Sequence, residues 1–351
     1  MINEQSKPGP EREGTLLKQP LLMDLENNVY LEGDELIIID RRKLPGEVIG
    51  MRCSNHEDVA RAIEEMAVQG AGDIAVTAGF GLYLAARKLP GKDARKDMAE
   101  LEKAAARLRA TRPTGFHLAV LVDRIVEKVR EGTGEKSHPE LILDYLRKIL
   151  DRQRSVSEDT GRNAESLLAD GDTILTHCFA GPALLYMLRY AKEKGKEVRV
   201  FCTETRPYLQ GARLTAWSVS EMGIDTTLIT DNMAAYCMSR GMIGKVFTAA
   251  DRIAMDGTVA NKVGTFQLAI AAAHHKIPFY ILAYGPPDRR TSSGKDIPIE
   301  MRDPSEVLEF RGTTISGPRV KALYPAFDLT PRELVTGIIT ASGVEIWKEE
   351  S

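Results

Sequence analysis

From Gly171 to Ala283 the chain alternates short apolar segments with longer amphipathic ones, and this alternation restricts the possible folds more than any other feature. The apolar segments are apolar throughout rather than at every second residue, which is typical of parallel strands buried on both faces. We therefore expect an α/β fold with a parallel sheet covered by helices on both sides. The expected strands are 173–176, 197–201, 225–229, 245–248 and 278–283, and the expected helices are 183–194, 210–222, 233–240 and 265–275.

The part of the chain before this alternation has a different pattern. Two short apolar runs joined by a Gly33-Asp34 turn predict a β-hairpin over 29–40. From His56 onward the apolar spacing becomes helical, so this half is expected to be mostly α. The predicted parts are a polar tail over 1–28, a hairpin and helical domain over 29–168, and a Rossmann-like catalytic domain over 169–351. The helices expected here are 56–69, one from 74 onward, 103–109, 118–130 and 141–168.

The charge and apolar pattern of the chain exclude several classes of protein. The 351 residues carry a formal net charge of −3 with both signs interspersed, so we expect no nucleic-acid partner. No apolar run reaches the roughly 18 residues of a membrane span, and the first residues lack the apolar core of a signal peptide. A cytoplasmic protein is therefore expected. The motifs GxGxxG and GxxxxGK[ST] are absent, which leaves a nicotinamide cofactor or a nucleoside triphosphate unsupported.

The four cysteines are placed singly, without the paired spacing of a zinc site or the density of a disulfide framework, so we expect them reduced and no metal site. They are Cys53, Cys178, Cys202 and Cys237. Cys178 differs from the others because it follows an expected strand at a small-residue turn, where open α/β sheets place their chemistry. A buried cysteine can equally be a small apolar filler, and position alone does not decide between these interpretations. Glu204, Asp231 and Asp251 follow other expected strands, so one crevice can collect all four side chains.

Three places in the sequence favour a bound phosphate. The turn at Gly70-Ala71 leads into an expected helix, whose first N–H groups and dipole favour an anion. Arg112 precedes another expected helix, and Asn261-Lys262 is interpreted as the opening of the alanine-rich helix that follows it. Each place offers donors of the kind that phosphates prefer.

Several stretches together resemble a known family. They are Thr176–Cys178, Glu204–Ala216, Thr230–Ala234, Ala250–Ile253 and Ala260–Thr265. They are similar to the signature stretches of the methylthioribose-1-phosphate isomerase family, which shares its fold with ribose-1,5-bisphosphate isomerases and with the regulatory subunits of initiation factor two-B. The likeness runs in order from about Tyr30 to Ala326.

The resemblance implies an aldose-1-phosphate to ketose-1-phosphate isomerase that needs no cofactor and forms a homodimer. It implies that Cys178 and Asp251 are catalytic, and that the substrate contacts are Gly70, Ala71, Arg112, Gln210, Asn261 and Lys262. This chain departs from the family pattern at four places. Gln69 replaces an arginine, Gly72-Asp73 replace Pro-Ala, Phe179-Ala180 replace Asn-Thr, and His117 replaces an asparagine.

The expected chemistry follows from an anomeric oxygen that is blocked by phosphate, so that an acid must protonate the ring oxygen before the ring can open. Asp251 is the candidate acid. Cys178 is either the base of an enediol route or a positioning group for a direct hydride shift. The substrate expected first is 5-methylthioribose 1-phosphate, with 5-deoxyribose 1-phosphate and ribose 1,5-bisphosphate as alternatives. A non-catalytic regulatory subunit related to initiation factor two-B is the remaining alternative.

Overall fold

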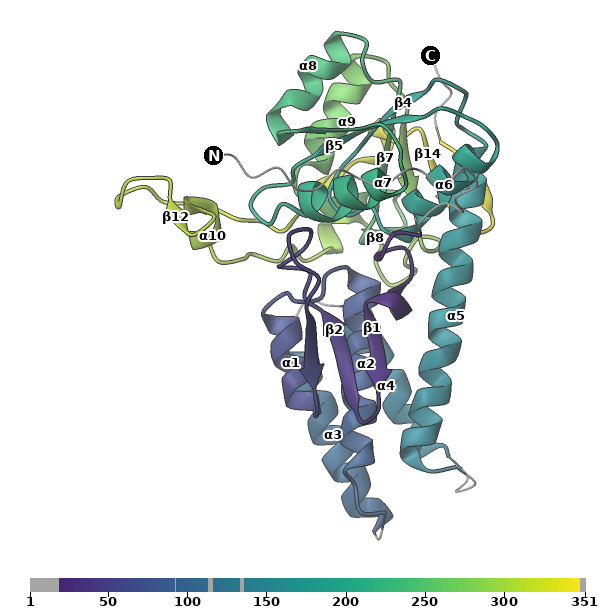
Figure 1. Cartoon of the computed structure of the whole chain (residues 1–351), viewed down its shortest axis with the longest axis vertical. Helices are drawn as coiled ribbons and strands as arrows, with labels where there is room; N and C mark the ends of the chain where they lie inside the picture. Colours follow the sequence, from purple (N-terminus) through teal and green to yellow (C-terminus); the bar gives the residue numbers. More distant parts are fainter. Residues whose placement is uncertain (1–18, 92, 113–115, 133–135, 348–351) are drawn as a thin grey trace, which may run out of the picture.

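The computed structural model describes residues 19–91, 93–112, 116–132 and 136–347. Figure 1 shows the first strands and helices below and the large sheet above, with one long helix beside both. That helix, α5 (His138–Glu165), packs on the N-terminal helix α2 (Ala71–Arg87) and on α6 (Pro182–Glu193) of the sheet region. The expected boundary at 168/169 therefore falls just after the helix that connects the two regions.

The N-terminal region consists of a small sheet and a group of helices. Its strands are β1 (Val29–Glu32), β2 (Glu35–Ile39) and β3 (Gly50–Cys53), and its remaining helices are α1 (His56–Glu64), α3 (Ala94–Ala110) and α4 (Phe116–Arg130). The predicted hairpin is confirmed, because β1 pairs antiparallel with β2. The sequence did not predict β3, which pairs with β2 after a ten-residue connection without apolar alternation. The mostly helical character of this half is confirmed.

The main sheet has the strand order β15-β14-β10-β7-β4-β5-β6. Its strands are β4 (Thr173–Thr176), β5 (Arg199–Thr203), β6 (Thr226–Ile229), β7 (Lys245–Ala249), β10 (Phe279–Leu282), β14 (Gly337–Thr340) and β15 (Gly343–Ile346). All neighbouring pairs are parallel except β14 and β15. The predicted α/β fold with a mostly parallel sheet is therefore confirmed.

Both faces of this sheet are buried, as the continuous apolarity of its strands predicts. Ile174 belongs to an apolar cluster with side chains of α6 and of α7 (Trp217–Glu221). The next residue, Leu175, belongs to a second cluster with side chains of α8 (Ala234–Ser239) and α9 (Thr265–His274). Successive residues of a strand point to opposite faces, so the inner strands β4, β5, β7, β10 and β14 contribute to both clusters.

The chain changes direction across the sheet at β4. From β4 it proceeds to β5 and β6 on one side, and then it crosses to β7 and β10 on the other side. In open α/β sheets such a switch point leaves a crevice outside the carboxyl ends of the two central strands. Here those ends belong to β4, which leads into Cys178, and to β7, which leads into Asp251.

A second small sheet lies in the sequence after β7. Its order is β13-β9-β8, with β8 (Arg252–Ile253), β9 (Val259–Lys262) and β13 (Phe327–Thr330). Asn261 and Lys262 are thus strand residues, and the expectation that they open the alanine-rich helix is wrong, since α9 begins at Thr265. The small-residue turn at Gly264 indicates the helix correctly, but the strand before it is fixed by β13, which comes more than sixty residues later.

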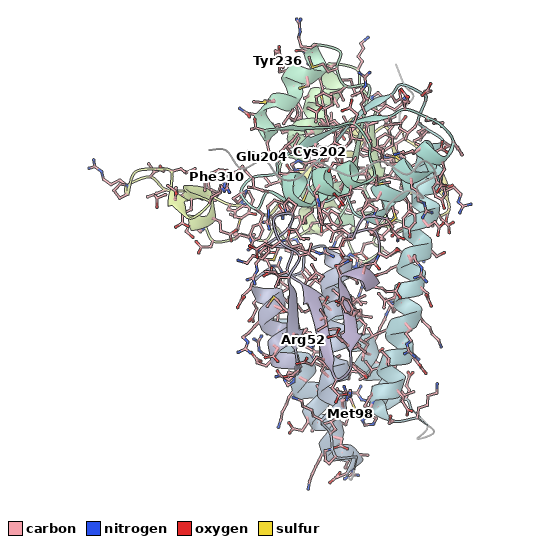
Figure 2. The ribbon with its side chains drawn as sticks, in the orientation of Figure 1. Arg52, Met98, Cys202, Glu204, Tyr236 and Phe310 are labelled. Atoms are coloured by element: carbon pink, nitrogen blue, oxygen red, sulfur yellow. The ribbon has the colours of Figure 1, made fainter. Side chains whose placement is uncertain are left out.

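The segment between β10 and β13 in the sequence includes an arm that extends from the body (Figure 1). It contains α10 (Ser305–Leu308), β11 (Glu309–Phe310) and β12 (Thr313–Thr314). Figure 2 shows Phe310 on this arm, away from the main sheet. No helix within the described ranges is long and apolar enough to cross a membrane.

Candidate active site

Cys178 lies in a left-handed backbone conformation, with a φ of 57°, directly after β4. Two hydrogen bonds hold this conformation. The Cys178 N–H donates to Thr205 Oγ1 at 3.0 Å, and the Thr215 hydroxyl donates to the Cys178 carbonyl oxygen at 2.6 Å. The thiol is therefore placed by the backbone of its turn and not by an ion pair of its own. It is partly buried.

The loop after β5 forms the next wall of the crevice. The Asp231 carboxylate accepts hydrogen bonds from the N–H groups of Thr205 and Arg206, at 2.7 Å and 2.8 Å. At Gly211 a Cβ atom would lie 1.8 Å from the Thr203 carbonyl oxygen, so only glycine allows the helix to start this close to β5. That helix begins with a π-helical turn over Gly211–Ala216, a feature that often marks functional sites.

Gln210 lies directly before that turn, and its side chain is only 5% exposed. Its amide oxygen has no hydrogen-bond partner among the described residues. A buried amide oxygen without a partner costs free energy, which a hydroxyl group of a bound substrate would recover.

His177 is turned away from the thiol. Its Nδ1 lies 2.6 Å from Thr203 Oγ1, and its Nε2 lies 3.0 Å from the Val263 carbonyl oxygen. Burial lowers the pKa of this imidazole. A catalytic Cys-His pair at 177–178 is therefore not formed, in agreement with the alternation of side chains along a strand.

Asp251 lies at the carboxyl end of β7, and its N–H donates to the Ala260 carbonyl oxygen at 2.9 Å. Burial raises the pKa of the Asp251 carboxyl group. The positive charges of Lys262, His117 and Arg112 act in the opposite direction. A carboxylic acid whose proton is retained by a dry environment is suited to general acid catalysis.

Burial also raises the pKa of the Cys178 thiol, to about 11, while Lys262 lowers it in part. The thiol is therefore predominantly protonated at neutral pH in the empty site. The charges of Asp251 and Asp231 both raise the pKa of this thiol. Thr205 is bonded to both Cys178 and Asp231, so the ends of β4, β5 and β6 lie together. Burial and the charge of Asp231 likewise raise the pKa of Glu204, which lies at the end of β5.

The Lys262 side chain carries a positive charge near these groups, and its Nζ lies 4.8 Å from the centre of the Phe327 ring. Burial raises the pKa values of both Cys178 and Asp251, and the charge of Lys262 is the largest influence that lowers them. The structure thus brings Lys262 to the predicted catalytic pair, although it does so from a strand. The neighbouring Asn261 donates through Nδ2 to Thr265 Oγ1 at 3.0 Å.

The start of α9 is not an open anion site. The Asp328 carboxylate accepts from the N–H groups of Gly264 at 2.7 Å and of Phe266 at 3.2 Å. Burial raises the pKa of Asp328 to about 6. The protein therefore supplies its own carboxylate at this helix N-terminus, and the expected role of the helix start in phosphate binding stays a prediction, in which the anion would have to compete with Asp328.

Arg112 reaches the crevice from the end of α3. Its Nη2 lies 3.1 Å from Glu300 Oε2, and Glu300 Oε1 lies 3.4 Å from Arg302 Nη1. The Arg302 guanidinium in turn covers the Tyr208 ring, with its Cζ 5.0 Å from the ring centre. These ion pairs connect the N-terminal helices to the base of the arm. Residues 113–115, which belong to the same sequence motif, lie outside the described ranges.

The Gly70-Ala71 turn does lead into a helix, since α2 begins at Ala71, and Gly70 has a φ of 99° that favours glycine. The Gln69 side chain is 3% exposed and donates to the Met66 carbonyl oxygen at 3.1 Å. The cation at this turn is instead Arg41, which the sequence did not indicate as a site residue. Its Nη2 lies 2.6 Å from Asp73 Oδ2. The two residues are 32 positions apart, and no local pattern connects them.

Comparison with known proteins adds to this geometry. The model of the Initiation factor 2 subunit family matches residues 67–345. A methylthioribose-1-phosphate isomerase from Thermosipho melanesiensis is 43% identical over 320 residues, covering 89% of this chain and 92% of that protein. One from Desulforudis audaxviator is 41% identical over 330 residues, covering 90% and 93%.

Solved structures of similar proteins also match nearly the whole chain. A 5-methylthioribose 1-phosphate isomerase from Pyrococcus horikoshii is 38% identical and superimposes with a TM-score of 0.83, covering 91% of this chain and 92% of that chain. A structure described as translation initiation factor eIF-2B, subunit delta, from A. fulgidus is also 38% identical, with a TM-score of 0.81 and coverage of 91% and 96%. The likeness therefore extends over nearly the whole chain and includes both an enzyme and a protein named as a translation factor.

Proposed function

The chain belongs to the Initiation factor 2 subunit family, and we propose that within this family it is the enzyme that converts 5-methylthioribose 1-phosphate to 5-methylthioribulose 1-phosphate. One observation carries the proposal. Cys178 and Asp251, which follow the two central strands at the switch point, both lie in a dry environment within electrostatic reach of Lys262. The relatives from Thermosipho melanesiensis and Desulforudis audaxviator, 43% and 41% identical to the chain, carry the name of this activity.

Asp251 acts as the acid that opens the sugar ring. It donates its proton to the ring oxygen while the bond between C1 and that oxygen breaks, because the phosphate on C1 prevents the opening that a free sugar undergoes. The raised pKa of Asp251 supports this role, since the carboxyl group must still carry its proton when the substrate binds. The positive charge that develops at C1 is then relieved by the next step.

In that step the hydrogen on C2 moves to C1 with its electron pair. C1 is reduced, C2 is oxidised to the ketone, and the proton of the C2 hydroxyl group returns to the Asp251 carboxylate. The sum is an isomerisation that consumes no other reactant. Cys178 positions the reacting carbons as a neutral thiol, because a thiol whose pKa is about 11 is a poor base at neutral pH.

The substrate contacts are the residues that surround this pair. Lys262 and Arg112 supply positive charge, and the Gly70-Ala71 turn supplies the backbone N–H groups at the start of α2. The unpartnered amide oxygen of Gln210 accepts a hydrogen bond from a sugar hydroxyl group. Asn261 orients the end of β9 through its bond to Thr265.

A regulatory subunit without activity is the second candidate, because a close structural neighbour carries the name of a translation initiation factor. The enzyme is favoured because a regulatory subunit has no use for a buried thiol and a buried carboxyl group at one switch point. To decide between the enzyme and the regulatory subunit, the protein is incubated in parallel with 5-methylthioribose 1-phosphate, 5-deoxyribose 1-phosphate and ribose 1,5-bisphosphate. Proton and phosphorus NMR should detect a ketose 1-phosphate with the methylthio sugar fastest. Absence of product from all three would refute the proposal.

The route is tested by running the same reaction in D₂O. A hydride shift keeps the transferred hydrogen, so the product should contain no deuterium at C1. An enediol route passes the hydrogen through an exchangeable base. Deuterium at C1 would therefore contradict the role given to Cys178.

We further propose that the protein is a homodimer. Apolar side chains are exposed along the edge strand β6 and the adjoining α8, among them Leu228, which is 51% exposed, and Tyr236, which is 64% exposed (Figure 2). An exposed edge strand beside apolar side chains is a favourable surface for a second copy. Light scattering at micromolar concentration should give about twice the mass of the chain, and Tyr236→Asp should reduce it to one copy. A monomeric mass for the unmodified protein would refute the dimer.

A further inference from the structure

Arg41 is the largest fully buried side chain of the described residues, with 1% of its surface exposed. Its Nη1 donates to the Gln69 carbonyl oxygen, and its Nη2 donates to Asn28 Oδ1 at 2.7 Å and to Asp73 Oδ2 at 2.6 Å. Its Nε has no hydrogen-bond partner among the described residues. A buried cation needs a counterion, and here Asp73 supplies it.

Asp73 is at the N-terminus of α2, in the first turn after Gly70. Its carboxylate folds back over the turn, since a Cβ atom at Gly70 would lie 3.6 Å from Asp73 Oδ2 and 3.9 Å from Arg41 Nη1. The first turn of a helix is where free N–H groups and the dipole favour an anion. In the empty protein Asp73 thus holds the position, beside an arginine and a helix start, that a bound phosphate would take.

This pair lies next to the reacting groups. The Arg41 guanidinium covers the ring of Phe179, the residue after Cys178, with its Cζ 5.6 Å from the ring centre. Just beyond, a Cβ atom at Gly181 would lie 3.4 Å from the Tyr284 hydroxyl group. The carboxyl end of β4 and the start of α2 therefore face each other across the Arg41 side chain.

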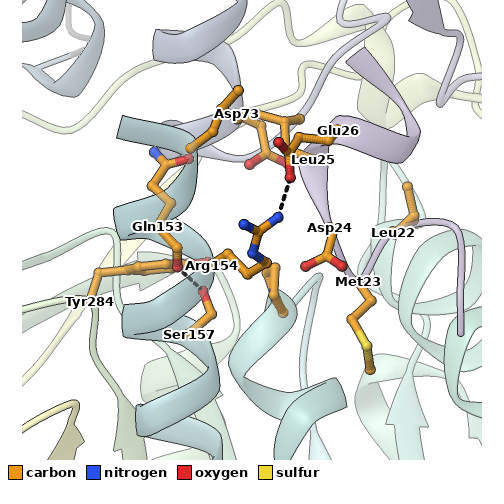
Figure 3. Close-up of a pocket in the computed structure, with 12 residues that line it drawn as sticks. Leu22, Met23, Asp24, Leu25, Glu26, Asp73, Gln153, Arg154, Ser157 and Tyr284 are labelled. Atoms are coloured by element: carbon orange, nitrogen blue, oxygen red, sulfur yellow. Dashed lines mark hydrogen bonds and ion pairs between the residues drawn. The ribbon is translucent and has the colours of Figure 1, made fainter. Parts of the chain in front are cut away.

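A cavity behind the turn gives the Asp73 side chain a second place to lie (Figure 3). It lies between Asp73, Gln153, Ser157, Tyr284 and the segment Leu22–Glu26, and it is partly open to solvent. Figure 3 shows the Gln153 amide at the same end of the cavity as Asp73. Gln153 Nε2 would lie 3.2 Å from a Cβ atom at Gly72, so an amide donor stands beside the turn that carries the carboxylate.

We propose that Asp73 is an internal counterion at the phosphate site, paired with Arg41 in the empty enzyme and displaced into the cavity when the substrate phosphate takes its place. The identity of the anion rests on the proposed function, whereas the competition itself does not. Asp73 then keeps the buried Arg41 neutralised between turnovers, and it lowers the affinity of the site for phosphate. It is the residue that sets how tightly this enzyme holds its substrate and product.

Asp73→Asn tests this directly, because the amide has nearly the same shape but no charge to compete with phosphate. The dissociation constant for inorganic phosphate, measured by calorimetry, should fall about tenfold. KM for the sugar phosphate should fall in the same direction. Arg41→Lys should weaken phosphate binding, since lysine cannot reproduce the planar guanidinium contacts. The matched control is Glu26→Gln, which lines the same cavity but is paired with Arg154 and not with Arg41.

Thermal unfolding gives a second readout. Asp73→Asn should lower the melting temperature without phosphate, because Arg41 loses its counterion, and added phosphate should raise it by more than in the unmodified protein. An unchanged or weaker phosphate affinity in Asp73→Asn would overturn the inference, even if isomerase activity is found. Tighter phosphate binding in a protein without isomerase activity would support the inference and refute the proposed function.

Discussion

The floor and the wall of the crevice are built in different ways. The floor consists of the turns after β4 and β7, where the Cys178 N–H donates to the Thr205 hydroxyl group and the Asp251 N–H donates to the Ala260 carbonyl oxygen. The wall consists of side chains from the N-terminal helices and the arm, held by ion pairs such as Arg41–Asp73 and Arg112–Glu300. The groups of the floor are held in one position by their turns, whereas a charged side chain of the wall can exchange its partner for another ion of the same charge, although loss of a buried partner without replacement is costly. The floor therefore fixes the reaction, and the wall adjusts the substrate affinity.

The largest effects are expected on the floor. Asp251→Asn should reduce kcat by roughly two to four orders of magnitude, the usual contribution of a positioned acid. Cys178→Ser should reduce it by roughly two orders of magnitude, the cost of misplacing the reacting atoms. The fold should persist, because the hydrogen bonds at both turns use backbone atoms of these residues. Steady-state kinetics and circular dichroism of the purified variants check both statements. A near-normal kcat in either variant would show that the floor does not carry the chemistry.

The next effect concerns Lys262, where floor and wall meet. Lys262→Ala should raise KM for the sugar phosphate roughly tenfold or more, because a charge-assisted contact to the phosphate is lost. Stability should change little, since within the described part of the chain the ammonium group makes a direct contact only with the Phe327 ring. Kinetics and thermal unfolding measured on the same sample separate the effect on KM from the effect on stability. A large loss of stability with an unchanged KM would make Lys262 a structural residue.

Lys262→Ala should also change the pH profile. Asp251 must carry its proton to act as an acid, so kcat is full below its pKa and is lost as the pH rises through it. Lys262 lowers the pKa of Asp251. Removing the lysine should therefore move the basic limb of the profile to higher pH. A shift to lower pH would contradict the assignment of Asp251 as the acid.

The smallest effect is expected from Glu300 in the wall. Its negative charge raises the pKa of Asp251, so Glu300→Gln should move the same basic limb to lower pH, by a few tenths of a unit. Glu306→Gln is the matched control, because Glu306 pairs with the neighbouring Arg302 at 3.0 Å and is not among the charges that act on Asp251. Equal shifts in both variants would show that Glu300 acts through the arm as a whole.

The same contrast decides what the sequence alone could predict. The floor was predictable, because each strand of the main sheet is a local apolar run, and the carboxyl ends of parallel strands meet at one edge. The wall was not, because Arg41 and Asp73 belong to separate elements whose contact depends on the folded packing. β9 was missed for a similar reason. It ends at Lys262 and is followed by Val263-Gly264, which together form a helix-start pattern, and only the pairing with β13 makes Val259–Lys262 a strand.

The departures from the family pattern also take on meaning in the structure. Gln69 and Asp73 flank the Gly70-Ala71 turn and Phe179 comes more than a hundred residues later, but the Gln69 carbonyl oxygen, the Asp73 carboxylate and the Phe179 ring all contact Arg41. They therefore form one altered corner of the wall and not three independent changes. This corner lies beside the floor without including it, which is consistent with an unchanged reaction and an adjusted affinity.

The most direct test of this division is a crystal structure of the Asp251→Asn variant with 5-methylthioribose 1-phosphate bound. The account predicts the C1–C2 bond of the sugar between Cys178 Sγ and residue 251, and the phosphate between Lys262 and the Gly70-Ala71 turn, with Asp73 turned away from Arg41. A sugar phosphate bound with C1 out of reach of Cys178, or with its phosphate in contact with neither Lys262 nor Gly70, would contradict it.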